Sequence, residues 1–173
     1  MSETMRRHVK ALELAKILHL LAEETSCDAA AELAQNLRPS TSLSQVKRLL
    51  TETDEAHTMM ARFGAPSFGG LKDVSNSLRR AEAGGTLNMT ELLRIATVLR
   101  TLRGIVDWRS KSEGVKCILD DLFDAIMPNK YLEDRINHAI LSEEEIADDA
   151  SPQLATIRRK IRSASSRARE QLE

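Results

Sequence analysis

The stretch NMTELLRIATVLRTLRGIVDWR, residues 88–109, decides the fold because it predicts a helix with an unusually broad apolar arc. Asn88 followed by Glu91 is a helix start signal, since each side chain can bond the backbone N–H of the other residue. A helix with so broad an arc is buried on more than one side, so we expect it at the centre of a helical bundle. The arc consists of Leu92, Ala96 and Leu99 on one face and Leu93, Ile95, Val98 and Leu102 beside it.

Helical periodicity continues on both sides of this central stretch. Side-chain caps are predicted at Ser26, Ser42 and Asp73, with Gln45 completing a capping box at Ser42. We therefore expect an all-α fold, a multi-helix bundle. The other predicted helices cover residues 8–24, 26–37, 42–60, 73–84, 115–126, 131–140 and 151–173.

The helix predicted over residues 42–60 has an apolar stripe at spacings of three and four, which we expect to face the core. His57 falls on this stripe, so it is interpreted as a core histidine whose hydrogen bonds are satisfied. The stripe consists of Leu43, Val46, Leu50, Thr53, His57 and Met60.

The last predicted helix starts at Ser151-Pro152, a hydroxyl cap followed by a proline at the first helical position. No stop signal comes after its apolar stripe, and we expect this segment to be part of a longer protein. The predicted organisation is a helical core domain over residues 1–150 and the start of a long helix over 151–173, truncated there. The stripe consists of Leu154, Ile157, Ile161, Ala164, Ala168 and Leu172.

The bulk composition fits one helical domain with an appended helix. Of the 173 residues, 42% are hydrophobic and only 3% aromatic, and the formal net charge is −1. A balanced charge does not single out nucleic acid as a partner. Lys10, Glu13 and Lys16 interrupt any signal-peptide core, and no apolar run approaches the ~20 residues that span a bilayer. We expect a cytoplasmic protein without a membrane partner, with Cys27 and Cys117 reduced and mostly buried.

The glycine-rich loop at residues 63–70, FGAPSFGG, has only part of a phosphate-binding motif. Gly64 and Gly69 have the spacing of the two P-loop glycines, but Gly70-Leu71 stands where Lys and Ser or Thr are required. We therefore expect no nucleotide here, and predict a loop held to the core by Phe63 and Phe68.

Other combinations of reactive side chains also lack catalytic geometry. His8 and His19 share a face of the first predicted helix but have no clustered third ligand, so a metal is not expected. Adjacent carboxylates such as Asp120-Asp121 and Glu143-Glu144-Glu145 point about 100° apart on a helix and do not converge. We predict no catalytic, cofactor-binding or metal-binding residue and no cofactor in this segment.

Three arginines of the last helix are the candidate contact residues. Arg158, Arg162 and Arg169 lie within about 40° of one another on the helical wheel, beside the apolar stripe. This row of arginines is suited to contacts with nucleic-acid phosphates. The favoured interpretation is that the arginines flank a helix–helix contact and pair with acids, because neither interleaved aromatics nor a net basic charge accompanies them.

Four stretches come in an order and spacing that match a known family over nearly the whole chain. In these stretches the chain resembles the MutS type-two proteins, and residues 107–129 match least. The stretches are LELAKIL at 12–18 with Leu21-Ala22, LRPST at 37–41 with LLTETDEA at 49–56, PSFGGLKDV at 66–74, and ASPQL at 150–154 with IRRKIR at 157–162.

The resemblance implies a MutS core-like helical domain and the start of a lever helix, from the N-terminal part of a longer ATPase. In that family a clamp and an ATPase with ATP and Mg²⁺ come later in the chain, a small nuclease domain usually ends it, and the mismatch-recognition domain is absent. The family binds branched DNA, suppresses recombination and rescues collided ribosomes, and the full-length protein is expected to be a homodimer. None of its ATPase or nuclease motifs falls within these residues. Two alternatives stay open: a stand-alone helical adaptor, and a weak nucleic-acid-binding module.

Overall fold

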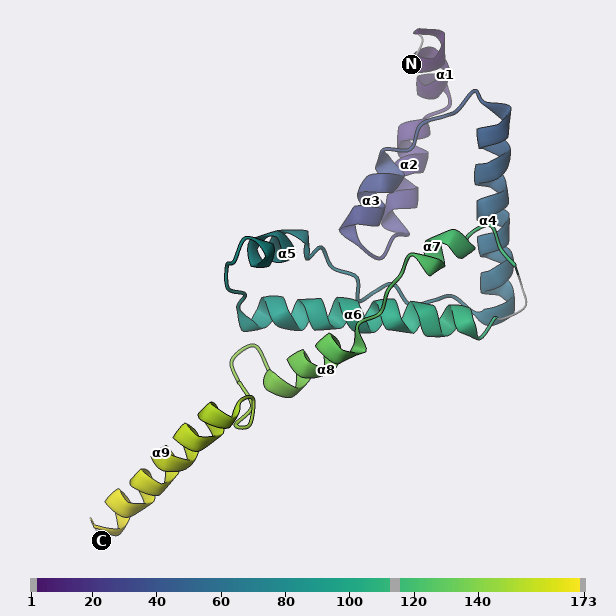
Figure 1. The fold of residues 1–173 in the computed structure, drawn as a ribbon. Coiled ribbons are helices and arrows are strands. Elements are labelled where there is room, and N and C mark those ends of the chain that lie inside the picture. Colours follow the sequence, from purple (N-terminus) through teal and green to yellow (C-terminus); the bar gives the residue numbers. More distant parts are fainter. Residues whose placement is uncertain (1–2, 113–115, 172–173) are drawn as a thin grey trace. The chain divides into compact units, whose positions relative to one another are not determined.

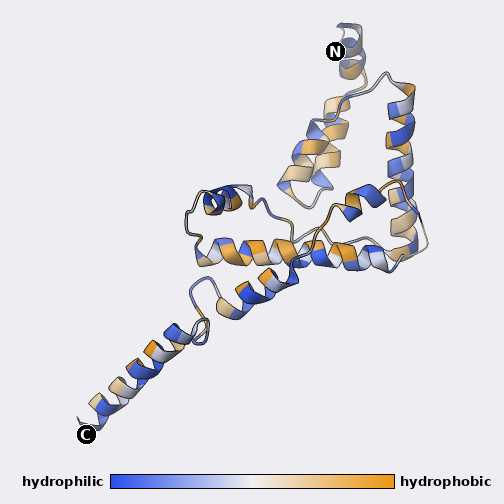
Figure 2. Cartoon of the chain, viewed as in Figure 1, coloured by the Kyte–Doolittle hydropathy of each residue, from blue (hydrophilic) through white to orange (hydrophobic). Residues whose placement is uncertain are grey.

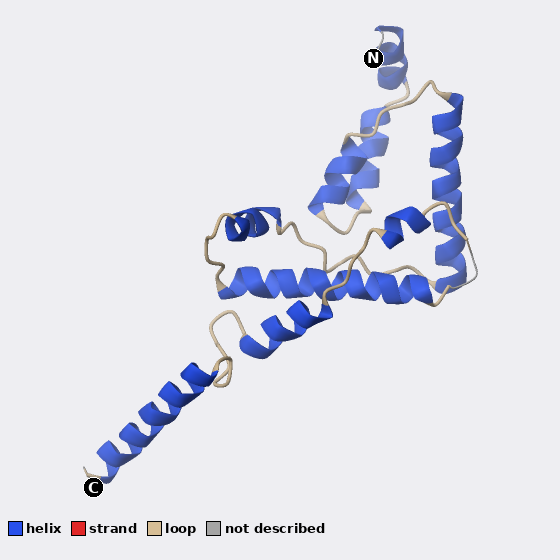
Figure 3. Cartoon of the chain, viewed as in Figure 1, coloured by secondary structure: helices blue, strands red, loops and turns tan. Residues whose placement is uncertain are grey.

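The computed structural model describes residues 3–112 and 116–171, except for the side chain of Met5. Within these residues it consists of helices and loops and contains no β-sheet (Figures 1 and 3). An isolated antiparallel bridge pairs Ile140 with Ile146. The all-α prediction is confirmed. The helices are α1 (Glu3–Ala11), α2 (Leu14–Glu23), α3 (Asp28–Gln35), α4 (Leu43–Phe63), α5 (Ser75–Glu82), α6 (Met89–Ser110), α7 (Asp120–Asp124), α8 (Lys130–Ala139) and α9 (Pro152–Glu170).

Backbone contacts divide the chain into two compact units. The first contains residues 1–73 and 100–128, and the second contains residues 74–99 and 129–173. The division falls within α6, whose first turns belong to the second unit and whose last turns belong to the first. The predicted boundary between residues 150 and 151 stays a prediction.

The core of the second unit forms between α6 and α8. Ile95 and Ala96 of α6 pack with Ile136 of α8 and with Ile140 just beyond it. The predicted capping box at the start of α6 is confirmed: the Glu91 N–H donates to Asn88 Oδ1 at 2.9 Å, and the Asn88 N–H donates to Glu91 Oε2 at 2.9 Å. Asn129 caps α8 in the same way, accepting from the Leu132 N–H at 3.0 Å. Local capping residues therefore determine where both helices of this core begin.

Helix α5 ends close to residue 84, as predicted, but does not begin as predicted. Its N-cap is Val74 rather than Asp73, and Val74 has no side-chain acceptor for the first turn. At the other end, Gly84 has φ 82°, and the N–H groups of Gly84 and Gly85 donate to the carbonyls of Ala81 and Arg80. This is a Schellman ending, which needs a left-handed residue that glycine supplies at little cost.

In the first unit, the predicted helix over residues 8–24 is broken in two. Glu13 adopts a left-handed backbone (φ 51°) between α1 and α2, and it pairs with Lys16 at 2.6 Å. His8 and His19 therefore belong to different helices, and the predicted shared face is wrong. The sequence does not predict this break, because neither glycine nor proline occurs there.

Helices α2 and α3 pack against each other as a helical hairpin in this unit. The N-cap of α3 is Cys27 rather than the predicted Ser26, and Cys27 makes no side-chain capping bond. Cys27 and Cys117 are both free thiols and half-buried, which makes them less buried than expected.

Helix α4 presents a different face to the protein than its apolar stripe predicts. Met59 is buried and Phe63 is half-buried, whereas Leu43, Leu50 and His57 are exposed. The prediction of a core histidine is therefore wrong. The helix starts at the predicted cap, with Ser42 Oγ accepting from the Gln45 N–H at 3.5 Å. The predicted capping box is wrong, because Gln45 Oε1 accepts from Ser40 Oγ at 2.6 Å and the Ser42 N–H donates to Ser40 Oγ at 3.2 Å.

The loop after α4 is held by Trp108 rather than by both phenylalanines. The Trp108 Nε1–H donates to the Gly64 carbonyl at 3.0 Å, and its ring lies 5.9 Å from that of Phe123. Phe68 is 42% exposed, so its predicted anchoring role is wrong. An indole hydrogen bond thus joins the end of α4 to the last turns of α6.

The predicted helix over residues 115–126 is reduced to the five residues of α7, and Val115 lies outside the described residues. Polar contacts explain the irregular backbone before α7. Asp120 accepts from Arg109 at 2.6 Å and from the Cys117 N–H at 3.1 Å, and Glu55 accepts from the Ile118 N–H at 2.5 Å. These side chains accept from backbone N–H groups just before α7, which the first turn of a helix leaves without an internal partner.

Candidate functional site at the start of the terminal helix

Helix α9 begins where the sequence predicts. Ser151 is the N-cap, its Oγ accepts from the Leu154 N–H at 3.1 Å, and Pro152 occupies the first turn. The helix has 19 residues, a length of about 28 Å at 1.5 Å per residue. None of its residues is fully buried. The candidate site is therefore a solvated helix whose attachment lies at its first turns.

The acidic connector between α8 and α9, residues 140–150, folds back onto the end of α8. Ile140 and Ile146 pair as an isolated antiparallel bridge, in which the Leu141 N–H donates to the Glu145 carbonyl at 2.9 Å and the Ala147 N–H donates to the Ala139 carbonyl at 3.0 Å. Ile140 and Ala147 are buried. This short extended piece around Ile146 ties the connector to the core of the second unit.

Asp148 of this connector joins it to α9. One carboxylate oxygen accepts from Arg158 Nη1 and the other accepts from Arg162 Nη1. The Arg158 guanidinium also donates to the Ile146 carbonyl at 2.9 Å. We call these three side chains, Asp148, Arg158 and Arg162, the clasp.

The electrostatics of the clasp favour the ionised carboxylate. The hydrogen bond from Arg158, followed by that from Arg162, lowers the pKa of Asp148 below its ordinary value, against a smaller opposing effect of desolvation. The two arginines lie one helical turn apart, so one carboxylate bridges the first turns of α9. Exposed ion pairs each add little stability, so the clasp is a small contribution to the free energy of folding.

The structure brings together two of the three predicted arginines. Arg158 and Arg162 share Asp148, as the helix-flank interpretation requires, while Arg169 lies exposed near the end of α9. The same helix also carries the exposed cations Arg159, Lys160 and Arg167. Phosphate contacts by Arg158 or Arg162 would have to compete with Asp148.

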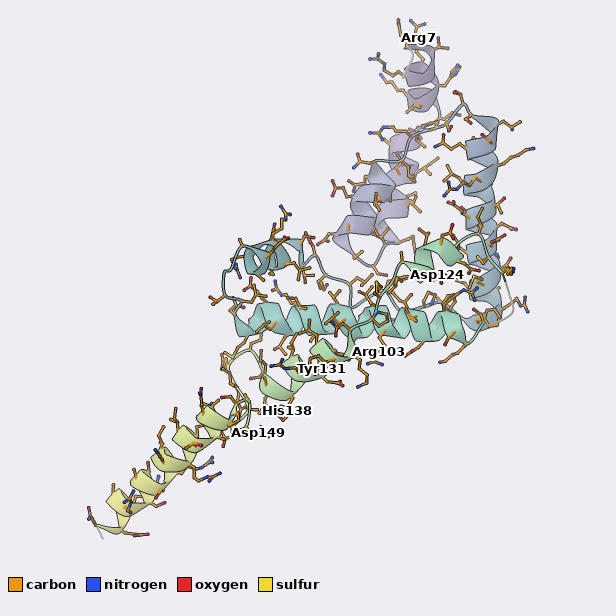
Figure 4. All side chains as sticks on the ribbon, viewed as in Figure 1. Arg7, Arg103, Asp124, Tyr131, His138 and Asp149 are labelled. Atoms are coloured by element: carbon orange, nitrogen blue, oxygen red, sulfur yellow. The ribbon has the colours of Figure 1, made fainter. Side chains whose placement is uncertain are left out.

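A second polar contact lies on the α8 side of the connector. His138 Nε2 and Asp149 Oδ2 are 3.7 Å apart, and both side chains are exposed (Figure 4). The fold of the connector brings His138 and Asp149 together. This pair adds a link between α8 and the residues just before Ser151.

The apolar stripe of α9 is largely exposed. Ile157 and Ile161 are 54% and 58% exposed, and Leu154 is half-buried. Leu172 lies outside the described residues. Hydrophobic residues are scattered along an otherwise hydrophilic helix in Figure 2. The described chain therefore leaves room for another surface against this stripe.

Asp148 is the residue that sequence reasoning missed. The acidic stretch before the helix and the basic stretch within it were visible, but which acid meets which arginine depends on the fold of the connector. Since the connector turns back at the Ile140–Ile146 bridge, Asp148 rather than the glutamates at 143–145 faces the arginines.

The chain has few other features that resemble a site. A hollow of about 500 Å³ lies in the first unit between α1, α2 and the end of α3. Within the described ranges, no group of three or more His, Cys, Asp or Glu side chains is arranged to hold a metal ion. Within the same ranges, no helix has the length and apolarity needed to cross a membrane.

Comparison with known proteins connects this architecture to one family. No family model matches the chain. Proteins named Endonuclease MutS2 match it over nearly all its length: the one from Acetivibrio thermocellus is 42% identical over 95% of the chain, that from Agathobacter rectalis 41% over 94%, and that from Ruminiclostridium cellulolyticum 37% over 94%. The chain belongs to the MutS2 family.

The match covers only part of each MutS2 relative. The chain spans about a fifth, 21%, of the length of the three MutS2 proteins. It is therefore a MutS2 segment, and the clasp and α9 lie within the matched family region.

Proposed function

We propose that this chain is a non-catalytic core-and-lever segment of a MutS2 protein, which passes conformational change to a distal clamp. The observation that carries the proposal is the clasp, because Asp148 holds Arg158 and Arg162 of α9 against a connector that is anchored on α8. A helix held at its first turns moves with the body that holds it.

The resemblance supplies the rest of the proposal. The full-length protein is a cytoplasmic ATPase that uses ATP and Mg²⁺, forms a homodimer and carries its nuclease in a C-terminal domain outside this segment. It binds branched DNA or recombination intermediates, collided ribosomes, or both. The segment contributes no reacting group and acts on these partners through the clamp.

The mechanism requires an element that transmits motion without bending. An α-helix of about 28 Å is such an element when its base is fixed. Coupling between distant sites is carried by packed elements with discrete arrangements. In this proposal nucleotide binding shifts the second unit, and α9 carries that shift to the clamp.

A chimera tests the proposal. Residues 1–173 replace the matching segment of the Acetivibrio thermocellus relative, and ATP hydrolysis and affinity for branched DNA are measured with and without ATP. We expect Asp148→Asn to leave hydrolysis unchanged and to reduce the effect of ATP on DNA affinity. Asp124→Asn, an exposed carboxylate of α7, is the matched control.

Two results would count against the lever. One is an Asp148→Asn chimera that responds to ATP as fully as the unmodified chimera. The other is rapid protease cleavage just after Ser151 in the chimera, because a rigidly attached helix protects its first turns.

A stand-alone helical adaptor is the second candidate, favoured by the exposed Ile157 and Ile161. An apolar helix face accepts an amphipathic partner helix. The DNA sequence downstream of codon 173 distinguishes the two candidates. A reading frame that continues into an ATPase domain would exclude the adaptor hypothesis. A stop codon directly after codon 173 would exclude the lever hypothesis.

A further inference from the structure

Helix α4 carries an apolar seam that the described chain leaves uncovered. Leu43, Leu50 and Met60 are 69%, 65% and 47% exposed, and only Val46 is half-buried. We call this row the α4 seam; its residues alternate at spacings of three and four over the whole helix. They are Leu43, Val46, Leu50, Thr53, His57 and Met60.

The seam is uncovered because the first unit uses another face of α4. Glu55 accepts from the Ile118 N–H at 2.5 Å, Met59 is buried, and Phe63 is half-buried at the end of the helix. These three residues centre about 150° around the helix from the seam, at 100° per residue. The seam is therefore free to contact another helix without disturbing the contacts of its own unit. Apolar and polar residues are interleaved along α4 in Figure 2.

The spacing of the seam is that of a coiled coil. Leu43, Leu50 and His57 repeat every seven residues, and Val46, Thr53 and Met60 repeat in the same way three residues later. These two series occupy the a and d positions of successive heptads. The helix supplies three such heptads without a break.

The flanks of the seam show which helix fits. On one side stand Lys47 and Asp54, seven residues apart, and on the other stand Leu49 and Ala56. In an antiparallel pair of identical helices, each flank meets the same flank of the other copy. Lys47 then lies near Asp54 of the other copy, twice by symmetry, and Leu49 lies near Ala56. A parallel pair would instead place the charged flank against the apolar one.

We propose that α4 pairs antiparallel with α4 of a second copy of this chain. The two-fold axis passes near residues 51 and 52. Leu43 then lies opposite Met60 of the other copy, Val46 opposite His57, and Leu50 opposite Thr53, so every layer joins an a residue to a d residue. This contact is isologous, as in most homodimers.

The pairing is a weak one. Thr53 and His57 place polar groups in four of the six layers of the symmetric pair, and a polar residue in such a layer lowers stability while it fixes register. The dimer is therefore concentration-dependent. Its existence does not depend on the proposed lever, which lies in the other unit.

Charge reversal tests the arrangement. Sedimentation equilibrium of the 173-residue chain gives the dimer dissociation constant for each variant. Lys47→Glu and Asp54→Lys should each raise this constant about tenfold, because each change removes two attractive contacts and creates two repulsive ones. The double variant Lys47→Glu/Asp54→Lys should restore it. Lys72→Glu, a loop residue away from the seam, is the control with the same charge change as Lys47→Glu.

A second variant keeps the result interpretable. Leu50→Glu should give a monomer with an unchanged helical circular dichroism spectrum, since Leu50 contacts solvent in the single chain. A chain that stays monomeric at several hundred micromolar overturns the proposal; the seam is then vacant or is covered by another part of a longer protein. A dimer that the double variant does not restore overturns it as well.

Discussion

Asp148 is the single residue on which the attachment of α9 depends. Its two carboxylate oxygens serve two arginines one turn apart, and Arg158 is held in addition by the Ile146 carbonyl. No other acid of the connector is shown in contact with these guanidinium groups within the described chain. A change at Asp148 therefore alters the direction of α9 without touching the buried core.

The clasp should persist well into the acidic range. The pKa of Asp148 is lowered by its hydrogen bonds with Arg158 and Arg162. A carboxyl with a depressed pKa in the folded state contributes stability that is full above its unfolded pKa, about 3.9, and is lost as pH falls through the folded pKa. NMR titration of the Asp148 carboxyl carbon should therefore give a midpoint below that ordinary value. A midpoint at or above it would contradict the clasp.

Gly64 is a residue at which a side chain is costly. Its backbone has φ 76° and ψ 168°, a region that is open essentially to glycine alone. We expect Gly64→Ala to lower the free energy of unfolding by about 1–3 kcal/mol in urea denaturation followed by circular dichroism. Gly69→Ala is the control, because a Cβ there meets open space and its φ is not positive. Equal effects of the two substitutions would disprove the strain at Gly64.

At the scale of elements, capping determines where the helices of the second unit begin. Asn88 and Glu91 exchange two hydrogen bonds at the start of α6, and Glu91 also accepts from Arg80 and Ser77 of α5. We expect Asn88→Ala to cost about 1 kcal/mol of unfolding free energy. Thr86→Ala, just outside the helix, is the matched control. A loss below a few tenths of a kcal/mol would show that α6 begins without its cap.

Sequence reasoning predicted those elements whose signals are local. Signals from neighbouring residues determine the helical character of the chain and the end of α5. They also determine the caps at Ser42, Asn88 and Ser151.

The errors arise where tertiary contacts override local pattern. The seam of α4 is apolar in sequence, yet Glu55 and Met59 on another face make the contacts of the first unit. Glu13 breaks the first predicted helix without a local signal. Before α7, the Ile118 N–H donates to Glu55, 63 positions earlier in the chain, a contact that local pattern does not show. The partner of the arginines could not be predicted because the connector's turn decides it.

At the scale of the whole molecule, the arginines of α9 distinguish a lever from an autonomous nucleic-acid binder. Arg158 and Arg162 are engaged with Asp148, which leaves Arg169 as the exposed member of the predicted stripe. We expect the isolated chain to bind a short DNA duplex weakly. Replacing Arg158, Arg162 and Arg169 with glutamine should change that binding little between two salt concentrations. A large loss of affinity, with a shallower salt dependence, would favour the binder.

The central claim is that α9 is held in one direction by the clasp, and a distance measurement tests it most directly. Spin labels are placed at Tyr131→Cys on α8 and Ser166→Cys on α9, both within the second unit, after Cys27 and Cys117 are replaced by serine. Double electron–electron resonance should give one narrow distribution of distances between the two labels. Asp148→Asn should broaden this distribution, and Asp124→Asn should leave it unchanged. A broad distribution with Asp148 intact would contradict the account.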